Sequence, residues 1–314
     1  MNKKKILVVG ELNIDLILNN IQGFPEIGSE KIADKMDFTL GSSSAILATN
    51  IAALGVSTSF CGLLGKDSFG KFILKELHTK NVDTRFVQLS EINKTGITVV
   101  MNYDQDRANV TYCGAMNELS IEHVPWNNLT EFDHLHFSNY FLQPGIQNDI
   151  VELFKKSKEA GISTSLDLQV DPEDEWKFNY QECLPFVDVF LPNEKELLRL
   201  SRRNSLEEAI NHIKQFTNIL ALKLGDQGGR VIHESEDIAL KPYLNNKYVD
   251  AIGAGDSFNA GFLKKYLDGA SLTECLDYAN LTGSLSTTAA GGTGAFAKNE
   301  NIEGKLNKIR KKEF

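Results

Sequence analysis

The stretch Lys5-Ile-Leu-Val-Val-Gly10 sets the fold class of this chain. It is a short run of apolar, mostly β-branched residues that ends at a glycine, a pattern typical of a strand buried on both faces. Strands of this kind usually belong to parallel sheets that are covered by helices on each side. The opening residues therefore favour an α/β protein built on a central sheet.

Helical and extended patterns alternate along the rest of the chain. Helical spacing over 39–55 ends at Gly55, and a predicted strand at 57–62 follows at once. Further on, we expect helices at 145–160, 194–201, 205–217, 255–268 and 271–289, and strands at 162–168, 218–224 and 230–233. Strands that alternate with helices indicate βαβ units, so we predict a doubly wound, mainly parallel sheet.

Two segments, 13–40 and 95–113, break this alternation. In the second, runs of period two flank the polar turn 102–107, which indicates a hairpin. The first segment leads directly into Gly41, where a candidate substrate stretch begins. We therefore expect one domain over 1–314 with both segments forming a small inserted β lid.

Composition and charge exclude several classes of protein. The chain has 314 residues, 42% of them hydrophobic, which is enough to bury a large core. Lys and Arg number 33 against 42 Asp and Glu, and the net charge of −9 repels nucleic acids and anionic membranes. Neither is expected as a partner. The four cysteines lie far apart without a Cys-x-x-Cys pair, so we expect reduced cysteines in a cytoplasmic protein.

The densest chemical signal is Asp250-Ala-Ile-Gly-Ala-Gly-Asp256, which leads into an amphipathic helix. The small residues Gly253, Ala254 and Gly255 allow backbone N–H groups to converge at a helix start, where anionic oxygens bind well. Asp256 could accept a proton from an attacking hydroxyl while those amides stabilise a phosphoryl group in transfer. The alternative is a plain glycine-rich turn with an ordinary acidic residue in the first turn of the helix.

A second signal is Leu191-Pro-Asn-Glu-Lys-Glu196, at the end of a buried strand. Asn193 would cap the following helix, and Glu196 stands at the capping-box position. The same two residues could instead hold the hydration shell of a Mg²⁺ ion, which keeps several waters and is often held through one carboxylate. The spacing alone leaves both interpretations open.

Three further stretches lie where ligands commonly bind. Leu222-Lys-Leu-Gly-Asp-Gln-Gly-Gly229 follows a buried strand, and its glycines either admit a nucleotide or make a tight turn. Gly41-Ser-Ser-Ser-Ala45 opens a helix with hydroxyl residues that suit a polyol or simple N-capping. Asn13 and Asp15 lie just beyond the first strand, at the edge of parallel sheets where ligands gather.

Several familiar motifs are absent. No Gly-x-Gly-x-x-Gly follows the first strand, which lowers the expectation of a nicotinamide-dependent dehydrogenase. The stretch after Gly62 resembles a phosphate-binding P-loop, but Phe60 stands where the first glycine should be and Asp67 where Ser or Thr should be. The chain also has no His-Glu-x-x-His and no Gly-x-Ser-x-Gly.

Taken in order, these motifs resemble the ribokinase-like (PfkB) carbohydrate kinase family nearly from end to end. The stretches that carry the resemblance are Val9 to Asp15 for the sugar-binding edge, Gly41 to Gly55 for the N-terminal signature, Gly62 to Gly70 for a Gly-x-x-Gly-x-Asp-x-x-Gly segment, Asn193 to Glu196 for the Asn-x-x-Glu magnesium motif and Asp250 to Asp256 for the Asp-x-x-Gly-Ala-Gly-Asp signature.

The resemblance implies a three-layer α/β/α body with a β lid. It also implies transfer of the ATP γ-phosphate to a hydroxyl of a small sugar, such as a ketohexose, a pentose or a 2-keto-3-deoxy sugar acid. Asp256 would be the general base, and Gly253, Ala254 and Gly255 the anion hole. Mg²⁺ is an implied cofactor, held with the help of Glu196, and Asp250 with the 291–294 loop would line a site for a monovalent cation such as K⁺.

The resemblance also assigns binding roles. The sugar would contact Asn13, Asp15, Gly41, Ser42 and Ser43, and the nucleotide would lie near Asn193, Lys223, Gly225, Gly228 and Asn280. Arg107 on the lid hairpin could contact a sugar hydroxyl or carboxylate, or be a solvated turn residue. Two positions depart from the family: Ser42 replaces the usual second glycine, and Ile46 replaces the asparagine of ribokinases.

Two other functions stay open at this point. A nucleoside kinase of the same fold would need an aromatic pair in the lid to stack the base, and Tyr103 and Tyr112 are the candidates. The second open function is a sensor that binds sugar or nucleotide without turnover, although the intact Asp256 turn argues against it. An exposed lid sheet could also pair across a two-fold axis, which would give a homodimer through the lid.

Overall fold

The computed structural model describes residues 3–103, 107–297 and 301–313. Within them the main sheet has the strand order β13-β12-β11-β10-β9-β8-β1-β4-β5, and only β12 and β13 run antiparallel to their neighbours. These strands are β1 (Lys5–Val9), β4 (Ser57–Gly65), β5 (Val82–Ser90), β8 (His134–Ser138), β9 (Ser163–Asp167), β10 (Val189–Phe190), β11 (Ile219–Lys223), β12 (Gly229–His233) and β13 (Glu236–Leu240).

Helices cover both faces of this sheet. They are α1 (Ser43–Ala53), α2 (Ser68–Thr79), α3 (Pro144–Gln147), α4 (Ile150–Glu159), α5 (Tyr180–Cys183), α6 (Glu194–Ser201), α7 (Leu206–Ile213), α8 (Ala254–Leu267), α9 (Leu272–Ser286) and α10 (Ile302–Arg310). One core holds side chains of α1, α2, α8, α9 and α10, and a second core on the opposite face holds side chains of α3, α4, α6 and α7.

Strand β1 shows why the sequence produces this layering. It pairs in parallel with β4 on one side and β8 on the other, so both of its faces are covered. Ile6 and Val8 point into the first core, and Leu7 and Val9 point into the second. The predicted α/β class with a mainly parallel sheet is confirmed.

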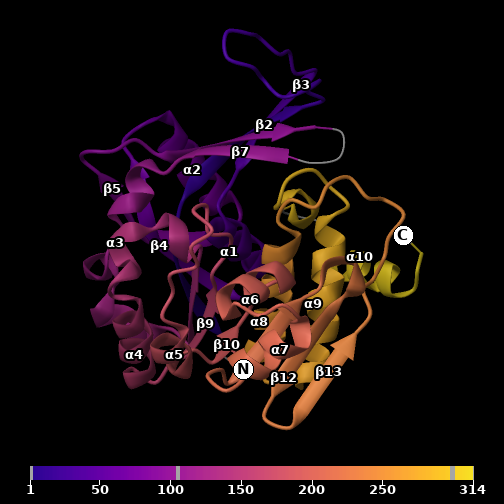
Figure 1. Ribbon diagram of the computed structural model, residues 1–314. Helices are drawn as coiled ribbons and strands as arrows, with labels where there is room; N and C mark the ends of the chain where they lie inside the picture. The colour runs from indigo at the N-terminus through magenta and orange to yellow at the C-terminus, as the bar shows by residue number, and fades with distance from the viewer. Residues whose placement is uncertain (1–2, 104–106, 298–300, 314) are drawn as a thin grey trace.

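The two segments that break the alternation pair with each other. Within the described residues they form a four-stranded sheet of order β3-β2-β6-β7, from β2 (Asn13–Asn19), β3 (Lys35–Leu40), β6 (Gly96–Asn102) and β7 (Arg107–Tyr112). This lid sheet lies above the main body in Figure 1. The polar turn expected at 102–107 falls partly on residues 104–106, which lie outside the described residues.

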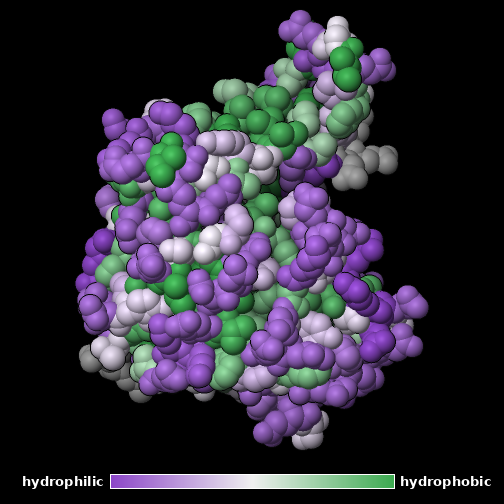
Figure 2. Space-filling view, turned by 60° about the vertical axis from the view of Figure 1, so that its left-hand side comes forward, coloured by the Kyte–Doolittle hydropathy of each residue, from purple (hydrophilic) through white to green (hydrophobic). Residues whose placement is uncertain are grey.

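The faces of the lid sheet differ in chemistry. Register places the following side chains on one face, which is apolar throughout: Ile14, Leu16, Leu18, Met36, Phe38, Leu40, Ile97, Val99, Met101, Ala108, Val110 and Tyr112. At its base this outer face contacts α2, where Phe38 packs against Phe69 and Phe72. Figure 2 shows apolar side chains gathered on the upper part of the molecule, where the lid lies. The opposite, inner face is mainly polar.

Several expected elements have different limits in the structure. The helix expected at 145–160 is two helices, α3 and α4, separated at residues 148–149. Asn and Asp have low helix propensity, which agrees with a break at this point. The helix expected to start at 39 begins only at Ser43, since 39–40 still pair in the lid sheet. None of the helices in the described residues is long and apolar enough to span a membrane.

Candidate active site

Residues 251–256, at the start of α8, form a wall between two cavities. Ala251, Ala254 and Gly255 line a cavity of about 380 Å³ between the β11–β12 turn and α9. Ile252, Gly253 and Asp256 line a second cavity of about 220 Å³ beneath the lid sheet. We call them the α9 cavity and the lid cavity. Neighbouring residues of one short turn thus face two separate binding spaces.

The lid cavity brings together most of the residues predicted for sugar binding. Its predicted members are Asn13, Asp15, Ser42, Ser43, Arg107, Gly253 and Asp256. The inner face of the lid sheet supplies a hydrogen-bonded row in which Asn13 Nδ2 donates to Thr98 Oγ1 at 2.8 Å and Thr98 Oγ1 lies 3.0 Å from Thr111 Oγ1. A ligand with several hydroxyl groups would find donors and acceptors along this row.

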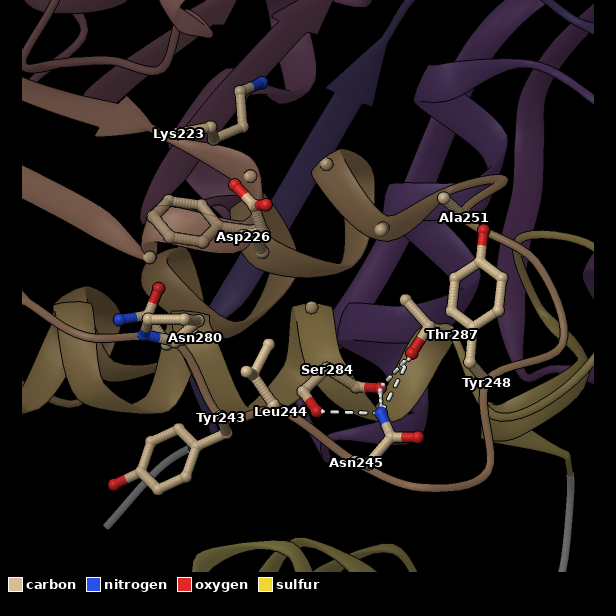
Figure 3. A pocket seen from close by; sticks show the side chains of 17 residues that line it. Lys223, Asp226, Tyr243, Leu244, Asn245, Tyr248, Ala251, Asn280, Ser284 and Thr287 are labelled. Carbon is tan, nitrogen blue, oxygen red and sulfur yellow. Dashed lines mark hydrogen bonds between the residues drawn. The ribbon is translucent and has the colours of Figure 1, made fainter. Parts of the chain in front are cut away.

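The α9 cavity contains four of the five residues predicted for the nucleotide, Lys223, Gly225, Gly228 and Asn280, together with Ala254 and Gly255 of the predicted anion hole. Figure 3 shows it from close by, with the segment that carries Tyr243, Leu244 and Tyr248 along one side. Asn245 ties this segment to α9, because its Nδ2 donates to Ser284 O at 3.1 Å and to Thr287 Oγ1 at 3.0 Å. The cavity therefore combines a polar end at Lys223 with an apolar side.

Gly253 allows the turn to pass close to a neighbouring loop. Its φ is +72°, and a Cβ at this position would lie 2.4 Å from Gly292 Cα, which no side chain could tolerate. The helix starts immediately after it, so the N–H groups of Gly255 and Asp256 precede the first intrahelical bonds. The N–H of Ala254, expected in the anion hole, donates to Ala251 O at 3.2 Å.

Asp256 belongs to a buried hydrogen-bond network centred on Asp167. Asp167 Oδ2 accepts from Lys223 Nζ at 2.7 Å, from Asn259 Nδ2 at 2.5 Å and from Gln169 Nε2 at 2.9 Å. The same Gln169 nitrogen donates to Asp256 Oδ1 at 3.1 Å. The network thus connects Lys223, in the α9 cavity, with Asp256, in the lid cavity.

Burial and charge shift the ionisation of these groups. Burial, followed by the charge of Asp167, raises the pKa of Asp256 well above its ordinary value. Burial and the Asp167 charge also raise the pKa of Glu196 to about 7. Burial alone would lower the pKa of Lys223, but the carboxylates of Asp167 and Glu196 raise it. Lys223 is therefore a buried cation, and Asp256 holds a proton more strongly than an exposed aspartate does.

Ser42 adopts the backbone conformation for which glycine is usual. Its φ is +70°, and two hydrogen bonds hold it there: Ser42 Oγ donates to Glu11 O at 2.6 Å and accepts from Ala45 N at 2.9 Å. Gly41, before it, lines neither cavity, but a Cβ there would lie 2.3 Å from Asp15 Oδ1. The absence of a side chain at Gly41 therefore leaves room for the Asp15 carboxylate.

Besides Gly41, three further predicted residues line neither cavity. Asn193 and Glu196 form a capping box at α6, in which the Glu196 carboxylate accepts from Asn193 N at 2.9 Å and from Asn193 Nδ2 at 2.6 Å. Glu196 is 2% exposed. The Asp250 carboxylate accepts from Ile252 N at 2.8 Å and from Gly291 N at 3.0 Å, so it joins the turn to the 291–294 loop. The monovalent-cation site stays a prediction.

Sequence reasoning missed several residues of the lid cavity. Gln169 and Asn139 each follow a strand and have positive φ values of 61° and 60°. Asn109 and Thr111 face the cavity from β7, together with Arg107. Their alternation with the apolar residues Ala108 and Val110 was the available signal, since every second side chain of a strand shares a face.

Comparison with known proteins places the chain in a family. Residues 3–299 match the pfkB family carbohydrate kinase domain. This chain belongs to the pfkB family of carbohydrate kinases. It is therefore a phosphotransferase with an alcohol group as acceptor.

Individual relatives agree over the whole chain. The ribokinase of Lactococcus lactis subsp. lactis is 27% identical over 97% of this chain and 98% of its own length. A putative ribokinase II of E. coli, solved with ATP and Mg²⁺, superposes with a TM-score of 0.81 at 24% identity and covers 98% of each chain. The adenosine kinase of Sinorhizobium meliloti gives a TM-score of 0.82 at 22% identity, over 94% of this chain and 98% of its own. These likenesses show the fold.

Proposed function

We propose that this protein transfers the γ-phosphate of ATP to a hydroxyl of a small free sugar, with Asp256 as the general base. The observation that carries the proposal is the 251–256 turn, whose residues line the α9 cavity on one side and the lid cavity on the other. ATP in the first cavity and sugar in the second would meet at the start of α8.

The chemistry of the step follows from this placement. Asp256 accepts the proton of the sugar hydroxyl as that oxygen forms a bond to the γ-phosphorus, and the bond from phosphorus to the bridging oxygen of ADP breaks. The amides at the start of α8 and the Lys223 ammonium stabilise the charge on the transferring group. The raised pKa of Asp256 makes it a stronger base than an exposed aspartate.

A Mg²⁺ ion bound with ATP fits the charges around this turn. The charges of Asp167, Glu196 and Asp256 all act on the ammonium of Lys223, and Asp167 Oδ1 is buried without a hydrogen-bond partner among the described residues. Among the residues that the structure describes, no group of three or more His, Cys, Asp or Glu side chains could hold a metal ion without other ligands. The ion would neutralise phosphate charge and be held mainly by the phosphates and water, with Glu196 near its hydration shell.

The lid cavity favours a free sugar over a nucleoside. No aromatic side chain is among the described residues that line it. Tyr112 lies on the outer face of the lid sheet, where it is 49% exposed, and Tyr103 stacks on Phe24 with ring centroids 6.0 Å apart. A nucleobase would therefore lack the stacking partners that both tyrosines were candidates to supply.

A turnover panel tests the substrate class. Purified protein with Mg²⁺ and ATP is offered D-ribose, D-fructose, 2-keto-3-deoxygluconate, adenosine and inosine, and ADP release is measured for each. We expect turnover of at least one sugar and none of either nucleoside. Turnover of nucleosides alone would contradict the proposed acceptor, and ATP binding without turnover of any sugar would favour a sensor.

A further inference from the structure

Gln169, a residue outside every sequence motif, bridges two carboxylates of the candidate active site. It lies two residues beyond Asp167, just after β9, and lines the lid cavity. Its Nε2 donates to Asp167 Oδ2 at 2.9 Å and to Asp256 Oδ1 at 3.1 Å. A single amide nitrogen therefore fixes the distance between two acidic groups that would otherwise repel each other.

The backbone of Gln169 is held in an unfavourable conformation. Its φ is +61°, a region that residues with a side chain seldom adopt. Conformations of this kind persist where surrounding contacts determine them, and they gather at functional sites. In this conformation the side-chain amide of Gln169 donates hydrogen bonds to both carboxylates.

The Asp167 end of the bridge is firmly anchored. Asp167 is fully buried and also accepts hydrogen bonds from Lys223 and Asn259. Gln169 extends this fixed group to Asp256 and occupies Oδ1 of its carboxylate. We expect the other oxygen, Oδ2, to take the proton from a hydroxyl in the lid cavity.

We propose that Gln169 is a positioning residue for the general base, holding the Asp256 carboxylate in register with the buried Asp167–Lys223 ion pair. The proposal rests on the function proposed above, because it needs Asp256 to act as the base. In this proposal Gln169 acts through Asp256. The role would account for a glutamine with a positive φ at this position after β9.

The bridge has a consequence for pH dependence. The charged groups that face Asp256 are Asp167 from β9, Lys223 from β11, Glu11 after β1 and Glu196 from α6. The three carboxylates and burial favour the protonated acid, whereas Lys223 and the Gln169 amide favour the carboxylate. Without the amide the pKa of Asp256 rises, so the enzyme needs a higher pH to keep its base ionised.

The test compares kcat/KM against pH for the wild-type enzyme and Gln169→Met, using the panel sugar that the wild type phosphorylates. Methionine has similar length, excludes water and donates no hydrogen bond. We expect the acid limb of the profile to move to higher pH by about one unit, and kcat on the plateau to fall roughly tenfold, as for the loss of a hydrogen bond to a charged group. The KM for ATP should stay unchanged.

Two further variants make the result decisive. Gln147→Met is the matched control, because the Gln147 amide donates to the carbonyls of Tyr140 and Phe141, away from Asp256, and it should keep the wild-type profile. Gln169→Gly removes the amide and relieves the strained φ, so it decides the question if the methionine variant does not fold. An acid limb that stays in place in the folded variant would overturn the role, even with reduced activity.

Failure of this proposal is distinguishable from failure of the proposed function. If the wild-type enzyme phosphorylates no sugar of the panel, the proposed function fails first. If the wild type is active and the acid limb does not move when the amide is removed, the kinase assignment stands and only the positioning role of Gln169 is wrong.

Discussion

Asp15 gives the candidate sugar site a pH dependence of its own. Burial raises its pKa to about 6, against the opposing effects of the Arg107 charge and a hydrogen bond from Asn13. In the proposed sugar site the carboxylate would accept hydrogen bonds from sugar hydroxyls above that pH, and this acceptor would be lost below it. We therefore expect the KM for the sugar to rise as the pH falls through 6, by about tenfold, the size of one hydrogen bond to a charged group.

The Asp15 expectation is measured as the sugar KM between about pH 5 and pH 8, in the wild type and in Asp15→Asn. The variant should have a high KM at every pH, because it cannot ionise at this position. Asp37→Asn, an exposed carboxylate elsewhere on the lid sheet, is the control and should follow the wild type. If the KM of Asp15→Asn rises as the pH falls in the same way as that of the wild type, another group is responsible for the titration.

Single residues were predictable where one local motif brings them together. Gly253 and Asp256 line the same cavity because they lie on one short turn. Asn13 and Asp15 line it as well, because they lie on one strand. Gln169 escaped prediction because its partner Asp256 is 87 positions away, and only the folded sheet places them within hydrogen-bond distance. The Asn193–Glu196 spacing fits a cap and a metal motif equally, and the capping box is present.

At the scale of elements, the lid sheet carries an exposed apolar face. Met36 is 64% exposed, Val110 60% and Tyr112 49%, on a face that register makes apolar throughout. Patches of this kind mark interfaces in soluble proteins. Because a second copy of this face would bury apolar side chains against apolar side chains, we propose a homodimer through the lid.

The dimer is tested by sedimentation velocity. The wild type should sediment with the mass of two chains, and the double variant Met36→Lys with Val110→Lys should sediment as one chain with an unchanged thermal melt. Leu89→Lys, an exposed apolar residue of β5, serves as the control and should remain dimeric. A monomeric wild type at micromolar concentration would contradict the proposal.

Elements were predictable in proportion to the regularity of their patterns. The lid segments stood out because period two replaced the α/β alternation, and β6 pairs with β7 as a hairpin. Helix α2 and strand β5 were not predicted, because the stretch around Asp67 was considered only as a phosphate-binding or family motif. In the structure Asp67 caps α2 by accepting from Gly70 N at 2.9 Å. The Asp67 side chain therefore marks the start of a helix.

For the whole molecule, the order of the strands determines where chemistry takes place. β1, β8, β9 and β11 run parallel side by side or one strand apart, so the residues that follow them, including Asn139, Gln169 and Gly225, emerge at one edge of the sheet. The start of α8 lies at this same edge, between the two cavities. The order of the motifs along the chain was enough to predict that they converge at one end of the sheet. The shape of the lid cavity and the identity of the sugar were not predictable, because they depend on how side chains pack across the lid.

The most direct test of the account is kcat for sugar phosphorylation by Asp256→Asn, together with ATP affinity. Removal of the base should lower kcat by roughly 10² or more while the Kd for ATP changes less than about twofold, because Asp256 faces the lid cavity. An unchanged kcat would show that another group takes the proton, and would contradict the assignment of this turn as the catalytic centre.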